Sequence, residues 1–186
     1  FLMSGFIASD QNNEIKTLGR GGSDYTASLL ASFLSADILE IWTDVSGMYT
    51  ANPSIVSQAK PIPKLSYQEA MELSHFGAKV LYPPTIQPLI EKKIPVIIKN
   101  TFDNKSPGTI ISSDYNTQEK NVVKGISHID NVSLINLEGS GMVGIPGFSQ
   151  RLFHSLSSNN INIIIEISDN FLALDQGKSI AFVSPK

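Results

Sequence analysis

Short runs of apolar residues alternate with segments of helical periodicity over the first two-thirds of this 186-residue chain. The apolar runs are typical of strands and fall at residues 6–9, 37–44, 94–99 and 109–111. Helical spacing is found at about 23–36, 66–80 and 84–92. Ser66 and Glu69 have the spacing of a capping box at the start of the second helix. Near-continuous apolar strands between helices are typical of a covered parallel sheet, so the pattern predicts an α/β fold.

The pattern changes after a polar, aperiodic stretch at 114–121, which predicts a linker. Beyond it, a half-buried strand, a helix and two further strands are expected at 132–137, from Phe148, at 161–167 and at 179–183. This β-α-β-β order is most of a small ferredoxin-like module, without its last helix and strand. We therefore expect three parts, at residues 1–113, 114–121 and 122–186, the last being an incomplete module.

Composition excludes several kinds of site and partner. The chain has no cysteine, which rules out disulfides and thiolate metal sites. Its net charge of −3, with no cluster of lysine and arginine, argues against a nucleic-acid surface. The longest apolar run, at 161–167, is too short to cross a membrane. We therefore expect no nucleic-acid or membrane partner and a cytoplasmic location.

A glycine-rich loop at Thr17–Tyr25 comes directly before the first predicted helix. Such a turn exposes backbone N–H groups at the positive end of the helix dipole, which favours an anion. Arg20 adds a planar fork for a carboxylate or phosphate, and Asp24 places an acid beside it. This mixed charge suits a zwitterion or a phosphate–metal complex. The loop matches neither common nucleotide fingerprint, so a tight turn in which Ser23 or Asp24 caps the helix stays open as the alternative.

Three further motifs follow the loop in order. They are I-W-T-D-V-S-G-M-Y-T at 41–50, S-Y-Q-E-A-M-E-L-S at 66–74 and F-G-A-K-V-L-Y-P at 76–83. Together with L-G-R-G-G-S-D-Y-T at 18–26, they resemble aspartokinase, and more closely the kinase part of bifunctional aspartokinase/homoserine dehydrogenases. The resemblance covers roughly residues 2–167. It implies the parallel sheet of the amino-acid-kinase (carbamate-kinase-like) fold, followed by an ACT regulatory module.

The resemblance also implies an activity and its site. Aspartokinases transfer the γ-phosphoryl group of ATP to the side-chain carboxylate of L-aspartate, in lysine, threonine and methionine synthesis, with Mg²⁺ arriving on ATP. By this resemblance Arg20 holds a substrate carboxylate, and Asp24 contacts the substrate amino group and orients active-site groups, with Ser23 beside it. The implied nucleotide contacts are Thr43, Asp44, Tyr49, Lys79 and Val80.

Ordinary structural roles stay open for several of these residues. Thr43 and Asp44 can cap a turn, Lys79 can be a solvated lysine at a helix end, and Tyr49 can be a half-buried aromatic. The sequence also departs from the family pattern, since Asn52 and Ser54 stand where aspartokinases usually have an aspartate and an ATP-contacting arginine. Tyr82-Pro83 likewise replaces the usual His-Pro.

The N-terminal Lys-Phe-Gly-Gly-Thr-Ser segment of the family, with the lysine thought to stabilise the transferring phosphoryl group, is absent. The chain also opens on Phe1–Ala8, which is typical of the middle of a strand. We therefore expect a fragment that is inactive as an aspartate kinase by itself.

A second glycine-rich loop, Gly139–Gly147, precedes the helix of the second module. Its N–H groups can donate to a carboxylate, and ACT modules bind amino acids at such edges, usually across a dimer. The resemblance suggests a homodimer under feedback by threonine, which is favoured, or lysine. The residues expected at the effector are Gly141, Met142, Gly144 and Gln150, unless the loop is a plain connection.

Two other functions stay open at this point. The first is a regulatory amino-acid-binding and dimerisation unit with a vestigial kinase portion, which the changes at Asn52 and Ser54 favour. The second is an amino-acid kinase acting on glutamate or on a nucleotide, which the ACT module and the pair Arg20 and Asp24 disfavour.

Overall fold

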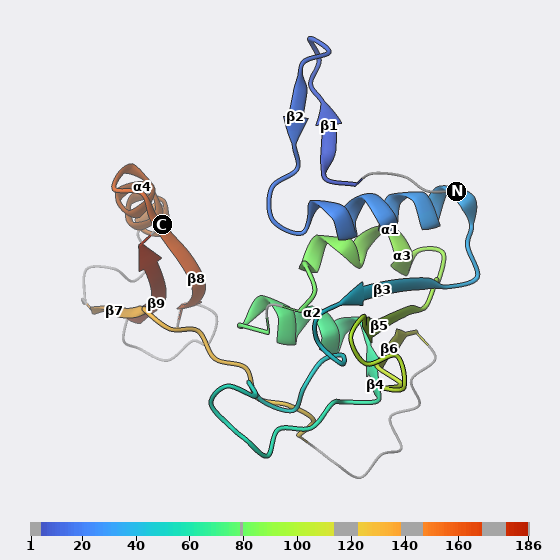
Figure 1. Ribbon diagram of the computed structural model, residues 1–186. Helices are drawn as coiled ribbons and strands as arrows, with labels where there is room; N and C mark the ends of the chain where they lie inside the picture. Colours follow the sequence, from blue (N-terminus) through green and yellow to red (C-terminus); the bar gives the residue numbers. More distant parts are fainter. Residues whose placement is uncertain (1–4, 79, 114–122, 139–146, 169–177, 186) are drawn as a thin grey trace. The chain divides into compact units, whose positions relative to one another are not determined.

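The chain folds into two compact units, Phe1–His128 and Ile129–Lys186. The computed structural model describes residues 5–78, 80–113, 123–138, 147–168 and 178–185 (Figure 1). The predicted linker at 114–121 lies outside these residues. Residues 123–128, which the sequence groups with the second module, belong to the first unit.

The first unit is built on a four-stranded sheet with the order β3-β5-β6-β4. These strands are β3 (Leu39–Thr43), β5 (Val96–Asn100), β6 (Thr109–Ser112) and β4 (Lys64–Ser66). The expected parallel pairing is present between β3 and β5 and between β4 and β6, whereas β5 and β6 pair antiparallel. A connection of only eight residues joins β5 to β6, which is too short for the crossover that a parallel pair needs. The α/β fold is therefore confirmed, with a mixed sheet.

Helices cover one face of this sheet (Figure 1). They are α1 (Gly22–Leu34), α2 (Tyr67–His75), the 3₁₀ turn η1 (Pro83–Thr85) and α3 (Gln87–Ile90). Buried apolar side chains from both layers form one core, including those of Ile41, Leu65, Ile86, Leu89 and Ile98.

The predicted capping box of α2 is confirmed. The Ser66 hydroxyl accepts a hydrogen bond from the Glu69 N–H, and the Glu69 carboxylate accepts one from the Ser66 N–H. The helix ends at His75 rather than near residue 80, because Gly77 takes φ +124° and the Ala78 N–H turns back to the Leu73 carbonyl.

The predicted helix at 84–92 is wrong in length. A 3₁₀ turn and one short α-helical turn take its place, since Pro83, Pro84 and Pro88 lack the N–H groups that a continuous helix requires. The sequence analysis also missed β4 and the strand β2 (Ile15–Thr17), which pairs antiparallel with β1 (Ile7–Ser9). This hairpin is exposed and short, so it carries no alternating burial signal.

One buried threonine closes the long loop between β3 and β4. The Thr109 hydroxyl accepts a hydrogen bond from the Met48 N–H at 2.8 Å and donates to the Ile62 carbonyl at 2.6 Å. The Ile62 N–H also donates to the Met48 carbonyl at 2.7 Å. A Cβ atom at Gly47 would overlap the Thr109 hydroxyl, so glycine lets the chain approach this closely. Residues 48 and 62 are thus held together as the neck of the loop.

The second unit has the predicted β-α-β-β order. Its elements are β7 (Ser133–Glu138), α4 (Phe148–Ser158), β8 (Ile161–Ser168) and β9 (Lys178–Pro185). The sheet order is β7-β9-β8, and both pairs are antiparallel. Leu156 of α4 is buried among Ile135, Leu152, Ile161 and Ile163.

We expect Thr109→Val to lower the free energy of unfolding by about 2 kcal/mol, because it leaves the buried Met48 N–H without an acceptor. Urea unfolding measures the change. Thr101→Val, at an exposed position, is the matched control and should change the free energy by about 0.5 kcal/mol or less. An unchanged midpoint for Thr109→Val would show that the neck does not depend on this hydroxyl.

Candidate functional site

The glycine-rich loop of the first unit ends in the N-terminus of α1. Gly19 and Gly21 both take φ +73°, and Gly21 is the N-cap residue of the helix. A Cβ atom at Gly21 would overlap the Tyr82 side chain, so the loop approaches η1 as closely as backbone allows. No side chain caps the first turn of α1, so neither Ser23 nor Asp24 is its capping residue.

Phe6, which the sequence analysis missed, forms backbone hydrogen bonds to residues on both sides of this loop. Its carbonyl accepts the Leu18 N–H at 2.8 Å, and its N–H donates to the Thr26 hydroxyl at 3.3 Å. The Thr26 hydroxyl in turn donates to the Gly22 carbonyl. Phe6 takes φ +77°, a strained conformation for a residue with a Cβ atom, and such strain is concentrated at functional sites. Nothing local in the sequence marks it.

The three predicted substrate residues lie together on this loop and on the first turn of α1. Arg20 and Ser23 are exposed, and Arg20 forms no ion pair with another described residue. Asp24 is half-buried, and this burial raises the pKa of its carboxyl above the ordinary value. An ionised, partly desolvated carboxylate favours a cationic partner. The loop therefore presents a guanidinium to solvent and an acid that a bound ammonium group would stabilise.

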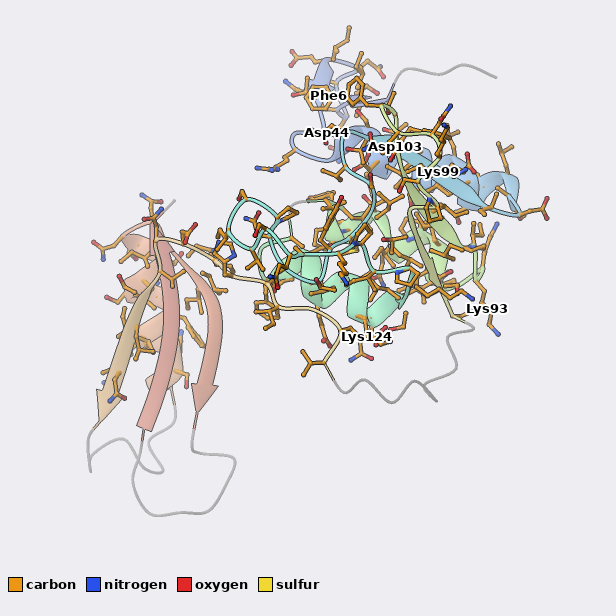
Figure 2. The ribbon with its side chains drawn as sticks, turned by 60° about the horizontal axis from the view of Figure 1, so that its bottom comes forward. Phe6, Asp44, Lys93, Lys99, Asp103 and Lys124 are labelled. Carbon is orange, nitrogen blue, oxygen red and sulfur yellow. The ribbon has the colours of Figure 1, made fainter. Side chains whose placement is uncertain are left out.

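Thr43 and Asp44 lie at the carboxyl end of β3, where open α/β sheets bind ligands. The Thr43 hydroxyl donates to Asp44 at 3.1 Å, and the Thr43 carbonyl accepts the Thr101 N–H at 2.8 Å. Figure 2 shows the exposed Asp44 and Asp103 beyond the ends of β3 and β5, on the same edge of the sheet.

The other predicted nucleotide residues differ from one another in burial and in surroundings. Tyr49 is half-buried and pairs with Pro61 in an isolated β-bridge just past the neck of the long loop. The Val80 side chain is half-buried and packs against the core. Lys79 lies outside the described residues.

A groove of about 950 Å³ runs between α1, α2 and η1. Its walls include Tyr25, His75, Tyr82, Pro84 and Glu91. No lysine or arginine is among the described residues that line it. None of the predicted substrate and nucleotide residues that the structure describes lines this groove.

Asn52 and Ser54 form a local turn. The Ser54 N–H and hydroxyl both donate to the Asn52 side-chain oxygen, at 3.0 and 2.7 Å. The Ser54 hydroxyl is thus already used within the loop and carries no positive charge for a phosphate.

The predicted effector residues Gly141, Met142 and Gly144 lie outside the described residues. Gln150 is exposed on the first turn of α4, after Gly147 at φ +83°. Over the described ranges, no group of three acidic or histidine side chains is arranged to hold a metal ion. Within those same ranges, no helix has the length and apolarity needed to span a membrane.

Comparison with known proteins identifies both units. The sequence profile of the amino acid kinase family matches residues 1–100, and the profile of an ACT domain matches residues 135–169. The chain belongs to the amino acid kinase family. Its resemblance to aspartokinase is also confirmed, because its curated relatives and its structural neighbours are aspartokinases.

One relative of this chain is the bifunctional aspartokinase/homoserine dehydrogenase of Haemophilus influenzae. It is 47% identical over 88% of this chain and 20% of that protein. Lysine-sensitive aspartokinase 3 of Escherichia coli is 38% identical over 93% of this chain and 38% of that protein. The chain thus spans about a fifth of the bifunctional relatives' length.

Solved structures agree. Escherichia coli aspartokinase III in complex with aspartate and ADP superposes with a TM-score of 0.78 and 35% identity, covering 98% of this chain and 39% of that one. Aspartate kinase of Clostridium acetobutylicum gives a TM-score of 0.78 and 35% identity, over 95% of this chain and 40% of that one.

We expect Asp24→Asn to raise the melting temperature at pH 7, because the raised pKa of Asp24 means that burial disfavours its ionised form. As pH rises through 3.8, the ordinary pKa of an aspartate carboxyl, Asp24 ionises first in the unfolded chain, and stability is lost until the folded pKa is passed. The gain should therefore vanish below about pH 3. Thermal melts from pH 3 to 8 measure it, with the exposed Asp37→Asn as control. A lower melting temperature for Asp24→Asn at pH 7 would contradict the assignment.

Proposed function

We propose that the chain carries the aspartate-binding loop and one edge of the nucleotide site of an aspartokinase. In that reaction the bond from the γ-phosphorus to the bridging oxygen of ATP breaks, a bond to a side-chain carboxylate oxygen of L-aspartate forms, and ADP leaves. The observation that carries the proposal is the loop before α1, which places the exposed Arg20 beside the half-buried Asp24. The solved relative that binds aspartate and ADP supports the same substrates.

Each charge on the loop matches a group of L-aspartate. Arg20 can donate two parallel hydrogen bonds to a carboxylate, and the ammonium group of the substrate can offset the unfavourable burial of the Asp24 carboxylate. Ser23 is exposed beside them and can donate a further hydrogen bond. A plain dicarboxylate would leave Asp24 facing like charge, so the loop favours an amino acid over a simple diacid.

The nucleotide is proposed at the edge formed by Thr43, Asp44 and Tyr49, with Lys79 and the backbone of Val80 completing it. Strand ends and a loop held at its neck fit a ligand that lies across the sheet edge. The Mg²⁺ ion is proposed to be held mainly by ATP phosphates and water. That ion would supply charge neutralisation on the phosphates.

The test is an assay of ADP formation by the complete protein, which should depend on both ATP and L-aspartate. Arg20→Lys should raise KM for aspartate about 20-fold with a smaller change in kcat, since lysine cannot provide the paired hydrogen bonds of a guanidinium. Arg151→Lys, at an exposed position of α4, is the matched control. ADP release that ignores L-aspartate, or an Arg20→Lys variant with unchanged KM, would refute the assignment.

Residues 1–186 alone should show no aspartate-dependent turnover in the same assay. The chain covers only 39% of an aspartokinase of known structure, so we propose that further substrate and phosphate contacts come from outside it. Measurable turnover by this chain alone would contradict that proposal.

The second unit is proposed to bind an amino-acid effector at the loop before α4 and to form a homodimer. Gly141, Met142, Gly144 and Gln150 remain the proposed contacts, with threonine favoured over lysine by the similarity to bifunctional enzymes. The lysine-sensitive aspartokinase among the relatives keeps lysine as the alternative. Calorimetry with each amino acid on the dimer should show saturable binding of one of them, and no heat from either would remove the proposal.

A regulatory unit without kinase activity is the second candidate. The turn in which Ser54 bonds to Asn52 favours it, because no cation is offered to ATP at that point. ATP binding by the complete protein separates the two, since a purely regulatory unit should bind an amino acid but no nucleotide.

A further inference from the structure

The last described segment of the first unit leads directly into the second unit. We call residues Lys124–His128 the strap, since they lie along the first unit and are followed at Ile129 by the second. In Figure 2, Lys124 is labelled beside α2. Three separate contacts hold the strap, and each falls on an element that carries or adjoins a proposed nucleotide residue.

The first contact is an ion pair at the start of α2. The Lys124 ammonium lies 2.7 Å from one oxygen of Glu69, and only 18% and 32% of these two side chains are exposed. The other oxygen of Glu69 accepts the Ser66 N–H at 2.8 Å in the capping box. Burial acts to raise the pKa of Glu69, but the hydrogen bonds from Lys124 and Ser66 outweigh it and hold the pKa below its usual value. One ionised carboxylate therefore joins the strap to the helix cap.

The second contact is on the long loop. The Ile126 N–H donates to the Thr50 carbonyl at 2.8 Å, and Gly125 packs against Leu73 and Ile62. Thr50 directly follows Tyr49, just beyond the neck closed by Thr109. A shift of the strap would therefore pull on the loop that presents Tyr49.

The third contact is at the end of α2. A Cβ atom at Gly77 would overlap the His128 carbonyl, and Gly77 takes φ +124°. Only glycine allows the strap to lie so close at this turn. Gly77 comes two residues before Lys79, so the strap also abuts the segment leading to that lysine.

We propose that the strap is a positioning element that sets the Tyr49 loop and the end of α2 for nucleotide binding, with Lys124 as its main fastening. This inference rests on the proposed nucleotide site. Lys124 touches no substrate in this scheme and acts through Glu69, while Ile126 of the same strap holds Thr50.

The test uses the complete protein and ADP as the probe. Lys124→Ala should raise Kd for ADP and KM for ATP about tenfold, while KM for aspartate changes less than about twofold. Lys124→Arg should restore most of the affinity, because it keeps the charge for Glu69. The control is Lys16→Ala, which removes a 2.8 Å ion pair to Glu14 on the exposed hairpin and should leave both constants unchanged.

A second variant and a second measurement separate the strap from the site it serves. Gly77→Ala should displace His128, and amide hydrogen exchange at Ile126 should then be about tenfold faster, as it should in Lys124→Ala. Gly19→Ala, which has φ +73° but open space around it, should leave that exchange unchanged.

The outcomes are distinguishable. If the wild-type protein binds no ADP, the proposed nucleotide site fails, and faster exchange at Thr50 and Ile126 in both variants would still identify the strap as the element that holds the loop. If exchange rises while ADP affinity stays the same, the strap is ordinary packing and the inference is overturned. Unchanged exchange in both variants overturns it as well.

Discussion

The buried hydroxyl of Thr109 is the contact on which the working parts of the first unit depend. It joins strand β6 to both Met48 and Ile62, and so closes a loop of more than ten residues at its neck. The closed neck restricts the conformations open to the residues between Met48 and Ile62, including Tyr49. Without it, the Thr50 carbonyl would have no fixed place at which to meet the Ile126 N–H. One side chain thus determines where two other segments can dock.

The substrate loop shows a related balance between stability and binding. Its backbone is held by Phe6 on one side and by the close approach of Gly21 to Tyr82 on the other. Phe6 has a strained φ, and Asp24 is partly desolvated. Both features lower the stability of the folded loop. A zwitterionic ligand would relieve the second of these. Such local costs are what a preorganised binding loop is expected to carry.

Sequence reasoning succeeded where the signal was local and failed where prolines or short strands weakened it. The capping box of Ser66 and Glu69 was predicted and is present, because its partners are three residues apart. The continuous helix at 84–92 was wrong, since its prolines lack the N–H groups of a continuous helix and leave a 3₁₀ turn and one short α-helical turn. Strands β2 and β4 were missed because three residues are too few to show a period. The antiparallel pairing of β5 with β6 follows from the short loop between them, a length that the sequence already shows.

Local sequence was sufficient for the class of fold, for the loop that presents Arg20 and Asp24, and for the order of motifs that marks an aspartokinase. Each of these depends on neighbours along the chain, whose chemistry is visible without coordinates. Long-range packing alone settled that Thr109 closes a distant loop and that Lys124 reaches Glu69. Those partners lie more than forty residues apart, and an isolated threonine or lysine has no pattern that distinguishes a buried anchor from a solvated side chain.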